Sequence, residues 1–374
     1  MDLSFDEDQR RLAATARRVL TERAGSAQLR RTLESPEGFD AELWKQLGQL
    51  GWTGITVPEA YGGLGLGPIE LTAVMEEMGR ALLCSPFFSS IALAMNVVLA
   101  LEDEAQRARH LPQLASGELR GALAYAEAGV EGTWPHAKAS AHRQGAAFVL
   151  NGEKSYVLDG QTADRLIVAL RLDGEAALFA VETDATGVHR TALRTLDPTR
   201  RQARIALRDV RVAGEALLAS GAAAERALSR ALDLATIALA AEQVGGAERC
   251  LDMALEHART RHQFGRPIGS FQAIKHLCAD MLTQLETARS GCYYAAAAAS
   301  RSDARSLAQL AAISKVCCSE AYFFCAAQSI QIHGGMGFTW EHDAQLHFKR
   351  ARSSMALLGE PALYRERTAA CLLD

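Results

Sequence analysis

The sequence predicts an α+β multidomain protein with a helical N-terminal domain (1–117), a middle β domain (118–218) and a C-terminal four-helix bundle (219–374). Two observations support this fold class. Apolar residues are spaced as in helices at both ends of the chain, whereas their spacing changes towards strict alternation in the middle. The chain of 374 residues is also long for one hydrophobic core, so we expect several packed units.

The N-terminal region is predicted to form helices separated by loops. DEDQRRLAATARRVLTERA, FDAELWKQLGQLGW and PIELTAVMEEMGRALL each repeat apolar residues three and four positions apart. The segment YGGLGLG (61–67) is rich in glycine, but it does not fit the dinucleotide-binding pattern GxGxxG. We therefore interpret it as a loop that does not contact a cofactor.

The middle region shows the alternation and the turns of antiparallel strands. An Asn151-Gly152 turn is expected to join two short strands in AAFVLNGEKSYVLDG, and Asp173-Gly174 marks a second hairpin. RIALRDVRV alternates as a half-buried strand does. This number of hairpins predicts an antiparallel β-barrel or sandwich.

The C-terminal region is predicted to contain four long helices. They are rich in Ala and Leu, which favour helices, and they lack internal proline. Such helices are expected to pack as an antiparallel bundle. Their predicted bounds are 224–260, 271–301, 305–332 and 341–358.

Composition excludes several function classes. The net charge of −4 gives no general attraction to nucleic acid or to an anionic membrane. The acidic N-terminus resembles no secretory signal, and the apolar run 91–101 is too short to cross a bilayer. The eight cysteines form no CxxC pair, and no histidine pair has a metal-binding spacing with supporting ligands. We expect a cytoplasmic protein with reduced thiols and no metal.

Two glycine-bearing segments between the predicted bundle helices could bind phosphate. They are TRHQFGRPIGSFQAIKHLCADM (260–281) and QIHGGMGFTWEH (331–342). A Gly-Gly break at a helix end exposes backbone amides, which suit a pyrophosphate together with a fixed guanidinium such as Arg261. The alternative is that Gly334 and Gly335 only end a helix and that Arg261 lies along the surface.

The same segments carry a family resemblance. R-x-Q-F-G-R-P-I-x-x-F-Q-A-x-K-H (261–276) and Q-I-H-G-G-x-G-F (331–338) resemble the two signatures of the acyl-CoA dehydrogenase family. LGWTGITVPEAYGGLG, LNGEKSYVLDG and the order of the domains are also similar to that family. The resemblance implies FAD as cofactor and oxidation of an acyl-CoA thioester to its 2,3-enoyl form, with electron-transfer flavoprotein as the expected acceptor.

The resemblance also implies which residues contact FAD. Arg261 and Gln263 would serve the pyrophosphate of a neighbouring subunit's FAD, so the smallest functional unit would be a dimer. The full set implied is Arg261, Gln263, Phe264, Phe271 and Gln272 around the first motif, Gln331, Gly334 and Gly335 around the second, and Tyr156 stacking along the flavin.

The β region departs from the family at its flavin-facing turn. Where the family has a turn of the type T-E-P-x-A-G-S-D, this chain has AEAGVEGTW (126–134), with Ala128 in place of Pro and Gly132 in place of Ser. Leu158 replaces the Thr of the W-I-T segment and cannot donate its hydrogen bond. The chain therefore lacks two groups that face the flavin in the family.

The catalytic base of the family is also missing. In most members a Glu precedes a Gly that matches Gly359, so the base position here is Leu358. A minority carry the base at a position that matches Ala235, next to an Arg that matches Thr236. Both base positions are apolar in this chain.

Three acids could be considered as substitutes. Glu360 lies two residues beyond Leu358, which on a helix turns the side chain roughly 200° away. Glu366, between two arginines, is interpreted as a solvated surface acid. Glu242 lies in the apolar stretch IALAAEQVGG and is either an interhelical partner or an unusual base. We assign no catalytic residue to this chain.

Three functions follow as hypotheses. The first is the base-lacking subunit of a hetero-oligomeric acyl-CoA dehydrogenase, expected as a heterotetramer with a homologous subunit, as in family members that act on steroid side chains. The second is a self-sufficient homo-oligomeric enzyme that uses Glu242. The third is a flavin monooxygenase on the same fold. The acyl group, whether from fatty acid or steroid side-chain catabolism, stays open.

Overall fold

The computed structural model describes residues 5–129 and 137–373, and its chain divides into two compact units. The bundle unit comprises Met1–Glu34, Gly67–Leu83 and Thr236–Asp374. The sheet unit comprises Ser35–Leu66 and Cys84–Ala235. Segments from the N-terminal region therefore belong to both units.

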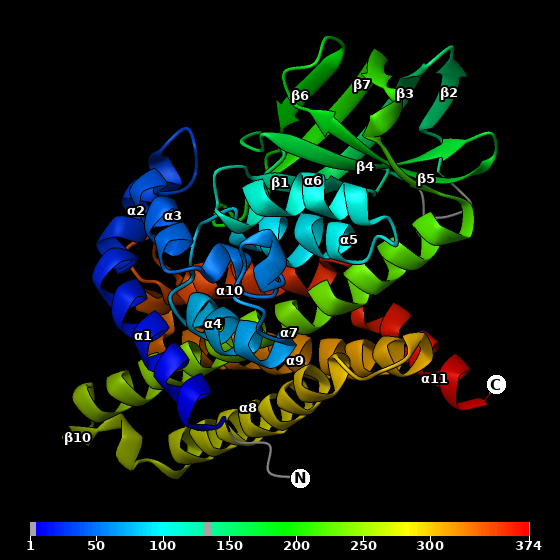
Figure 1. The fold of residues 1–374 in the computed structure, drawn as a ribbon. Helices are drawn as coiled ribbons and strands as arrows, with labels where there is room; N and C mark the ends of the chain where they lie inside the picture. The colour runs from blue at the N-terminus through cyan, green and yellow to red at the C-terminus, as the bar shows by residue number, and fades with distance from the viewer. Residues whose placement is uncertain (1–4, 130–136, 374) are drawn as a thin grey trace. The chain divides into compact units, whose positions relative to one another are not determined.

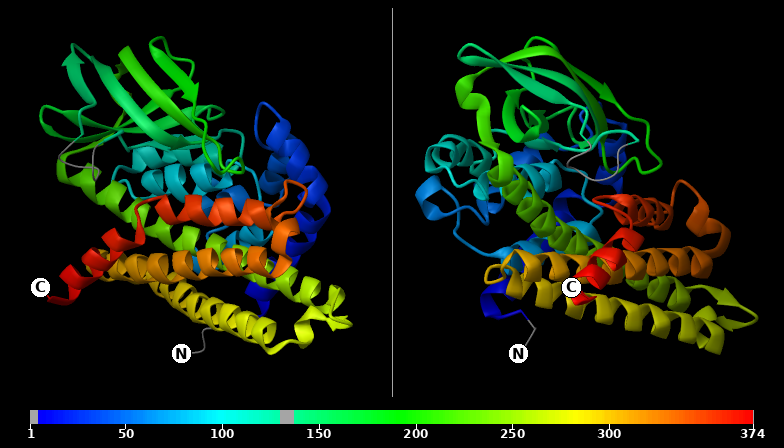
Figure 2. Two further views of the ribbon diagram at one scale, coloured as in Figure 1. Left: turned by 180° about the vertical axis from the view of Figure 1, so that it is seen from behind. Right: turned by 90° about the vertical axis from the view of Figure 1, so that its right-hand side faces the viewer.

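The bundle unit is built of long helices. Its helices are α1 (Glu7–Arg23), α2 (Ser26–Glu34), α4 (Pro68–Arg80), α7 (Gly221–Thr260, which begins in the sheet unit), α8 (Gln272–Ala299), α9 (Ala304–His333), α10 (Ala344–Ala356) and α11 (Pro361–Leu373). Figures 1 and 2 show α8 and α9 running side by side, and α9 also packs against α10 and α11. Two short 3₁₀ turns, Ile268–Ser270 and Gly334–Phe338, connect these helices.

The first three predicted bundle helices are confirmed, whereas the fourth is shorter than expected. α10 ends at Ala356, Leu357 is extended, and Leu358 has a positive φ of 63°. Pro361 then begins a further helix, α11, in the position where proline's fixed φ suits a helix start. The sequence analysis did not predict α11, since its fourth helix was expected to end at residue 358.

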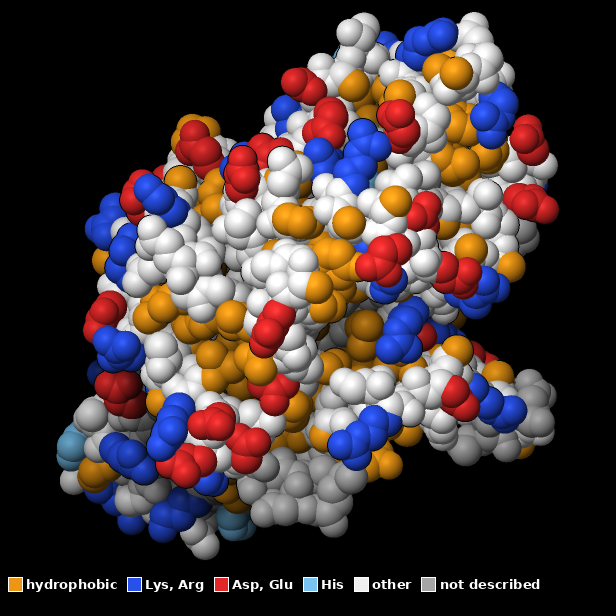
Figure 3. Space-filling view, viewed as in Figure 1, with side chains coloured by type: hydrophobic (Ala, Val, Ile, Leu, Met, Phe, Trp, Pro, Cys, Tyr) orange, Lys and Arg blue, Asp and Glu red, His pale blue; other side chains and the backbone are white. Residues whose placement is uncertain are grey.

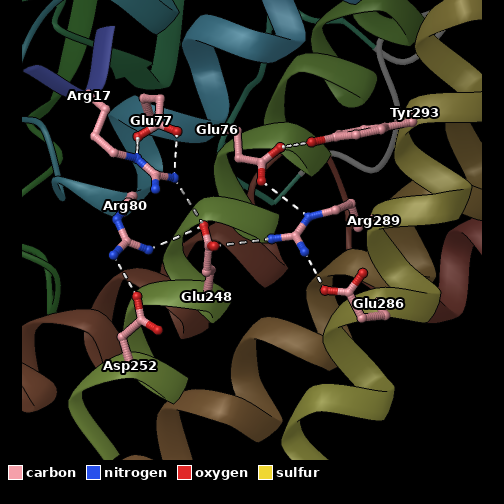
Figure 4. A network of polar contacts seen from close by, with 9 residues as sticks. All are labelled: Arg17, Glu76, Glu77, Arg80, Glu248, Asp252, Glu286, Arg289 and Tyr293. Atoms are coloured by element: carbon pink, nitrogen blue, oxygen red, sulfur yellow. Dashed lines mark hydrogen bonds and ion pairs between the residues drawn. The ribbon is translucent and has the colours of Figure 1, made fainter. Parts of the chain in front are cut away.

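A network of charged side chains ties α1, α4, α7 and α8 together (Figure 4). Glu248 of α7 lies 3.2 Å from Arg80 and 3.6 Å from Arg17. It also lies 3.6 Å from Arg289 of α8, which contacts the buried Glu76 of α4 at 3.2 Å. Because each carboxylate meets a guanidinium, these charges are compensated at the helix interfaces.

One helix of the bundle is apolar enough to be compared with a membrane span. Among the residues that the structure describes, only Ala304–Phe338 is long and apolar enough by composition to cross a bilayer. Its most apolar window is 56% buried inside the protein, as in the core helix of a bundle.

The sheet unit combines one β-sheet with short helices. Its strands are β1 (Gly121–Ala124), β2 (Ser140–Gln144), β3 (Ala147–Leu158), β4 (Arg165–Leu172), β5 (Glu175–Glu182), β6 (Val188–Ala192), β7 (Gln202–Ala213) and β8 (Leu217–Ser220). Its helical segments are α3 (Ala41–Gln49), the π-helix Phe88–Met95, α5 (Asn96–Leu99), α6 (Glu104–Ala115) and the 3₁₀ turns Trp52–Gly54, Glu59–Tyr61 and Gly214–Ala216.

The sheet is mainly antiparallel, as the sequence predicts, and it folds over on itself. The order is β6-β7-β3-β2-β4-β5-β8, while β1 pairs with β4 in parallel and β2 makes a short parallel pairing with β4. Phe148 of β3 and Phe179 of β5 are not on neighbouring strands, yet their ring centroids lie 5.2 Å apart in the core. Figures 1 and 2 show the corresponding two layers, which resemble a sandwich.

The expected turn at Asn151-Gly152 is wrong. β3 runs without a break through both residues, and its register against β7 shifts between Leu150 and Gly152, which marks a β-bulge. Gly152 has φ +135°, and a Cβ there would lie 2.4 Å from the Cβ of Ala139, so only glycine fits. The Asn151 side chain exchanges hydrogen bonds with Asp209 instead of closing a turn.

The second predicted hairpin is confirmed. β4 and β5 pair in antiparallel register around Asp173 and Gly174, which have φ values of 52° and 89°. Two successive positive φ values are typical of the type I′ turn that joins right-twisted strands.

Candidate functional site

The backbone of Leu358, where the family resemblance places the base, is held by a buried tyrosine hydroxyl. The Tyr364 hydroxyl of α11 donates to the Leu358 carbonyl at 2.9 Å and lies 3.2 Å from Oγ1 of Thr236. Tyr364 and Thr236 are buried. The two positions at which the family resemblance places a base and an Arg, Leu358 and Thr236, are therefore joined through a tyrosine.

A buried lysine holds the segment that leads to this position. Lys315 of α9 is fully buried, and its Nζ donates to the carbonyls of Ser354 and Leu357 at 2.6 and 2.7 Å. The last carbonyls of a helix have no partner within that helix, so a cation at this place both satisfies and attracts them. The sequence analysis missed Lys315, although a single lysine within AAISKVCCSEA is a detectable signal.

The acid nearest in sequence to the base position, Glu360, is exposed. It lies between α10 and α11, so the helical argument used to exclude it does not apply. Its carboxylate lies 3.4 Å from Arg352, and both side chains are 48% exposed. Glu366 on α11 is also exposed, as expected.

The third candidate acid, Glu242, is buried in an ion pair. Its carboxylate accepts a hydrogen bond from Arg350 of α10 at 2.8 Å, and the two side chains are only 6% and 4% exposed. Arg350 also donates to the carbonyl of Leu83. The predicted interhelical salt bridge is thus confirmed. Ala235, the minority base position, is fully buried.

The first cofactor motif forms an exposed hairpin at the end of α7. β9 (His262–Gln263) pairs with β10 (Arg266–Pro267) around Phe264 and Gly265, whose φ values are 54° and 77°. Phe264 is 91% exposed, which is unusual for a large aromatic side chain. Arg261 is exposed too, and its side chain makes no hydrogen bond or ion pair with any residue that the structure describes.

The remaining residues of this motif surround the hairpin. Phe271 packs edge-on against Phe264 with centroids 6.1 Å apart, and Arg266 lies 4.1 Å over the Phe271 ring. Gln272 is the exposed first residue of α8. Gln263 is exposed, and its amide donates to the carbonyl of His262.

The second motif lies at the same end of the bundle unit. α9 ends at His333, whose ring stacks on His257 of α7 with centroids 4.5 Å apart. Gln331, Gly334 and Gly335 are exposed, and a Cβ at either glycine would meet nothing within 4 Å. The structure therefore brings the two predicted motifs to one end of the bundle, where the Arg261 guanidinium is exposed while the Gly334 amide donates to the carbonyls of Ile330 and Gln331.

In the sheet unit, Tyr156 is presented to solvent while Leu158 is not. Tyr156 has φ +59° and is 55% exposed, whereas Leu158 is 3% exposed. Buried Lys154 anchors this strand by donating to the Glu127 carboxylate at 2.7 Å. Gly132, the expected position of the missing serine, lies outside the described residues.

FAD is the cofactor of the family whose signatures these motifs resemble, and the residues present fit only part of it. The exposed Arg261 guanidinium suits a pyrophosphate, whereas the Gly334 amide already donates to the carbonyls of Ile330 and Gln331. An exposed Tyr156 ring suits stacking on the flavin. Leu158 offers no hydroxyl donor there, so the fit is incomplete on both the pyrophosphate side and the flavin side.

Comparisons with known proteins agree with these motifs. Residues 6–118 match the model of the acyl-CoA dehydrogenase N-terminal domain, and residues 224–373 match that of the C-terminal domain. The chain is 34% identical over 356 residues to acyl-CoA dehydrogenase IpdE2 of Mycobacterium tuberculosis, covering 95% of this chain and 94% of that protein.

Solved structures extend the likeness to the whole fold. A chain of the ChsE4-ChsE5 complex from Mycobacterium tuberculosis matches with a TM-score of 0.91 and 27% identity, covering 100% of this chain and 99% of that one. A structure described as electron transferring flavoprotein of Acidaminococcus fermentans matches with a TM-score of 0.93 and 26% identity over both full chains. Family models, relatives and structures agree, and the chain belongs to the acyl-CoA dehydrogenase family.

Proposed function

We propose that this chain is the base-lacking subunit of a two-chain acyl-CoA dehydrogenase. It would assemble with a homologous chain that carries the catalytic Glu, as a heterotetramer. In that assembly it would contribute Arg261, Gln263, Gln331, Gly334 and Gly335 to the pyrophosphate side of the partner's FAD. Electron-transfer flavoprotein would reoxidise the cofactor, and a fatty-acyl or steroid side-chain thioester would be the substrate.

The observation that carries this proposal is the state of the candidate acids. Removal of the α proton needs a carboxylate that is free to accept it and placed at the substrate carbon. Leu358 cannot accept a proton, Glu360 is paired at the surface, and Glu242 is held by Arg350 inside the bundle. The pairing of Glu242 also argues against the self-sufficient homo-oligomer.

The uneven fit to the cofactor supports the same assignment. Bound FAD would supply the hydride acceptor for the acyl β carbon. This chain's own residues offer the exposed Arg261 cation for the pyrophosphate, but Leu158 gives no hydroxyl where the flavin would need one. A subunit that serves a partner's cofactor needs the cation and not the hydroxyl.

A relative's assembly is consistent with this proposal. The ChsE4-ChsE5 complex joins two differently named chains, and another matched structure, at 28% identity and a TM-score of 0.89, is a variant of the Tcur3481-Tcur3483 steroid acyl-CoA dehydrogenase. Both therefore favour a partner chain for this protein, and the second also favours a steroid thioester as its substrate.

The test is to purify the chain alone and together with a homologous chain that retains the Glu. We expect the chain alone to carry well under one FAD per polypeptide, measured by flavin absorbance after denaturation, and to be inert towards acyl-CoA. Co-expression should yield a stable complex, full flavin occupancy and bleaching of the flavin by acyl-CoA. Stoichiometric FAD with turnover in the chain alone would overturn the proposal.

A further inference from the structure

Three histidine rings from separate segments lie in contact at the end of the bundle unit, one pair stacked and the other tilted, and we call this group the stack. His257 belongs to the last turn of α7, His333 ends α9, and His342 precedes α10. The ring centroids of His257 and His333 lie 4.5 Å apart at an interplanar angle of 26°, and those of His333 and His342 lie 4.4 Å apart at 52°. No group of three or more His, Cys, Asp or Glu in the described residues could hold a metal, so the stack needs another explanation.

Backbone hydrogen bonds define the protonation of two of these rings. His333 Nδ1 lies 2.7 Å from the Ser329 carbonyl, which can only accept, so Nδ1 carries the proton. The Ala344 amide donates to His342 Nδ1 at 3.1 Å, so that nitrogen carries a lone pair. An imidazolium has no lone pair. Protonation of His342 would therefore break the bond to the first residue of α10.

The charges around the stack also oppose protonation. Burial lowers the pKa of His257, and His333, Arg261 and His342 lower it further. Burial likewise lowers the pKa of His342. His333 and the guanidinium groups of Arg249 and Arg30 add to this effect, while Asp343 opposes it. A positive charge at the start of α10 is also unfavourable to the helix dipole.

Residues 334–343, which join α9 to α10 and include His342, are held by the histidine rings and by α2 and α10. Arg30 of α2 donates to the carbonyls of Trp340 and Glu341 and to the Asp343 carboxylate. Ser26 of α2 also donates to Asp343 at 2.8 Å, and Lys349 of α10 lies 5.3 Å from the centroid of the Trp340 ring. Releasing the rings would leave this loop attached mainly at its later residues, while its start at Gly334 and Gly335 would lose a contact.

We propose that His257, His333 and His342 form an acid-sensitive latch, in which protonation of His257 or His342 releases loop 334–343 and frays the start of α10. Neutral imidazoles close the latch by ring contact and by accepting the Ala344 amide. A proton on His257 or His342 is repelled by the neighbouring guanidinium groups, and a proton on His342 also removes that acceptor. The proposal concerns the loop alone and does not depend on the cofactor or the partner.

The direction of the pH response follows from linkage. An open loop exposes histidines with an ordinary pKa near 6.5, whereas the closed latch lowers the pKa of His257 and His342. The closed state is therefore fully favoured above about pH 6.5 and loses stability as pH falls below it. Uptake of a proton on opening raises the open fraction as pH falls, by at most about tenfold per pH unit for each proton taken up.

The experiment is hydrogen–deuterium exchange of the full chain at pH 7.5 and pH 5, followed in peptides that cover 334–347. Rates are divided by those of the unfolded chain at the same pH, which removes the intrinsic pH dependence of exchange. We expect opening of this segment to increase by more than about threefold at pH 5. A wild-type chain whose protection there does not change would overturn the latch.

His342→Asn is the main variant, because the Asn oxygen can accept the Ala344 amide and does not titrate. Its opening should change less than threefold between the two pH values. His276→Asn, at an exposed position on α8, is the matched control and should keep the wild-type response. If His342→Asn does not fold, His342→Ser replaces it, because its hydroxyl can also accept the Ala344 amide and does not titrate. A wild-type acid response in the variant used overturns the proposal.

Discussion

Tyr364 connects the two positions that would carry proton-transfer chemistry in related chains. Its hydroxyl contacts the carbonyl of Leu358 and the hydroxyl of Thr236, and its side chain is 2% exposed. Leu358 keeps a left-handed backbone that is unfavourable for a leucine, at a cost on the order of 1 kcal/mol. The hydrogen bond from Tyr364 helps to hold that conformation.

Replacing Tyr364 with Phe should lower the free energy of unfolding by about 1–2 kcal/mol, because the Leu358 carbonyl and the Thr236 hydroxyl each lose a contact. Urea denaturation measures the change. Tyr294→Phe, at a side chain 49% exposed, is the control and should change stability by less than about 0.5 kcal/mol. Equal changes in the free energy of unfolding would show that the Tyr364 hydroxyl makes no stabilising hydrogen bond.

Glu242 and Arg350 should behave as a structural pair. Glu242→Gln leaves the Arg350 charge buried without its carboxylate, which typically costs about 3–5 kcal/mol of stability. Replacing both residues with Met removes the two charges together and should recover most of that loss in the same denaturation assay. A double variant as unstable as Glu242→Gln would show that the pair itself, and not an uncompensated charge, stabilises the bundle.

At the scale of elements, the positions of α10 and β3 depend on contacts that are distant in sequence. Lys315 of α9 binds the last carbonyls of α10, which fixes where the chain leaves that helix. Gly152 allows β3 to continue past Ala139 through a bulge.

Gly152→Ala should destabilise the sheet unit by more than about 2 kcal/mol, because the added methyl would overlap Ala139 and the φ of +135° is strained for alanine. Gly145→Ala is the matched control. Gly145 also has a positive φ, of 63°, but a Cβ there meets nothing within 4 Å, so only about 1 kcal/mol is expected. Thermal unfolding followed by circular dichroism compares the stability of the two variants. A larger loss of stability for Gly145→Ala than for Gly152→Ala would contradict the bulge.

These elements also show what the sequence could and could not predict. Helical periodicity and the Asp173-Gly174 turn predicted long helices and a hairpin correctly, because both signals are local. Asn151-Gly152 carries the same local signal as a turn, but pairing with Asp209 makes it a bulge. Glu242 could be assigned to a salt bridge, yet its partner Arg350 and the roles of Lys315 and Tyr364 depend on tertiary contacts.

At the scale of the whole molecule, each unit buries a neutral histidine. In the bundle unit, burial lowers the pKa of His347 to about 3, with Arg249, Arg350 and Arg80 adding to the effect. In the sheet unit, burial lowers the pKa of His110 to about 4, helped by Arg165 and Arg109. Both histidines therefore become protonated when the chain unfolds in mild acid.

The free energy of unfolding should consequently fall between pH 6.5 and pH 5, by about 2 kcal/mol for each of the two histidines. The folded pKa values lie below the unfolded value near 6.5, so this stability is complete above pH 6.5 and is lost as pH falls. Urea denaturation at pH 7 and pH 5 measures the loss. The His347→Gln variant can keep a hydrogen bond to Tyr322 without titrating. Its free energy of unfolding should therefore fall between pH 7 and pH 5 by about 2 kcal/mol less than that of the wild-type chain. An unchanged loss would contradict the buried neutral state.

The central claim is tested most directly by finding which chain of the two-chain complex supplies the proton acceptor. The rate of flavin bleaching by acyl-CoA is measured anaerobically in complexes that carry substitutions in one chain or in the other. Changing the partner's catalytic Glu to Gln should slow bleaching by about 10²–10⁴-fold, whereas Glu242→Met with Arg350→Met in this chain should leave the rate within about threefold. If the complex with the changed Glu242 assembles, binds FAD and fails to bleach, while the partner variant remains active, then this chain carries the base and the account is contradicted.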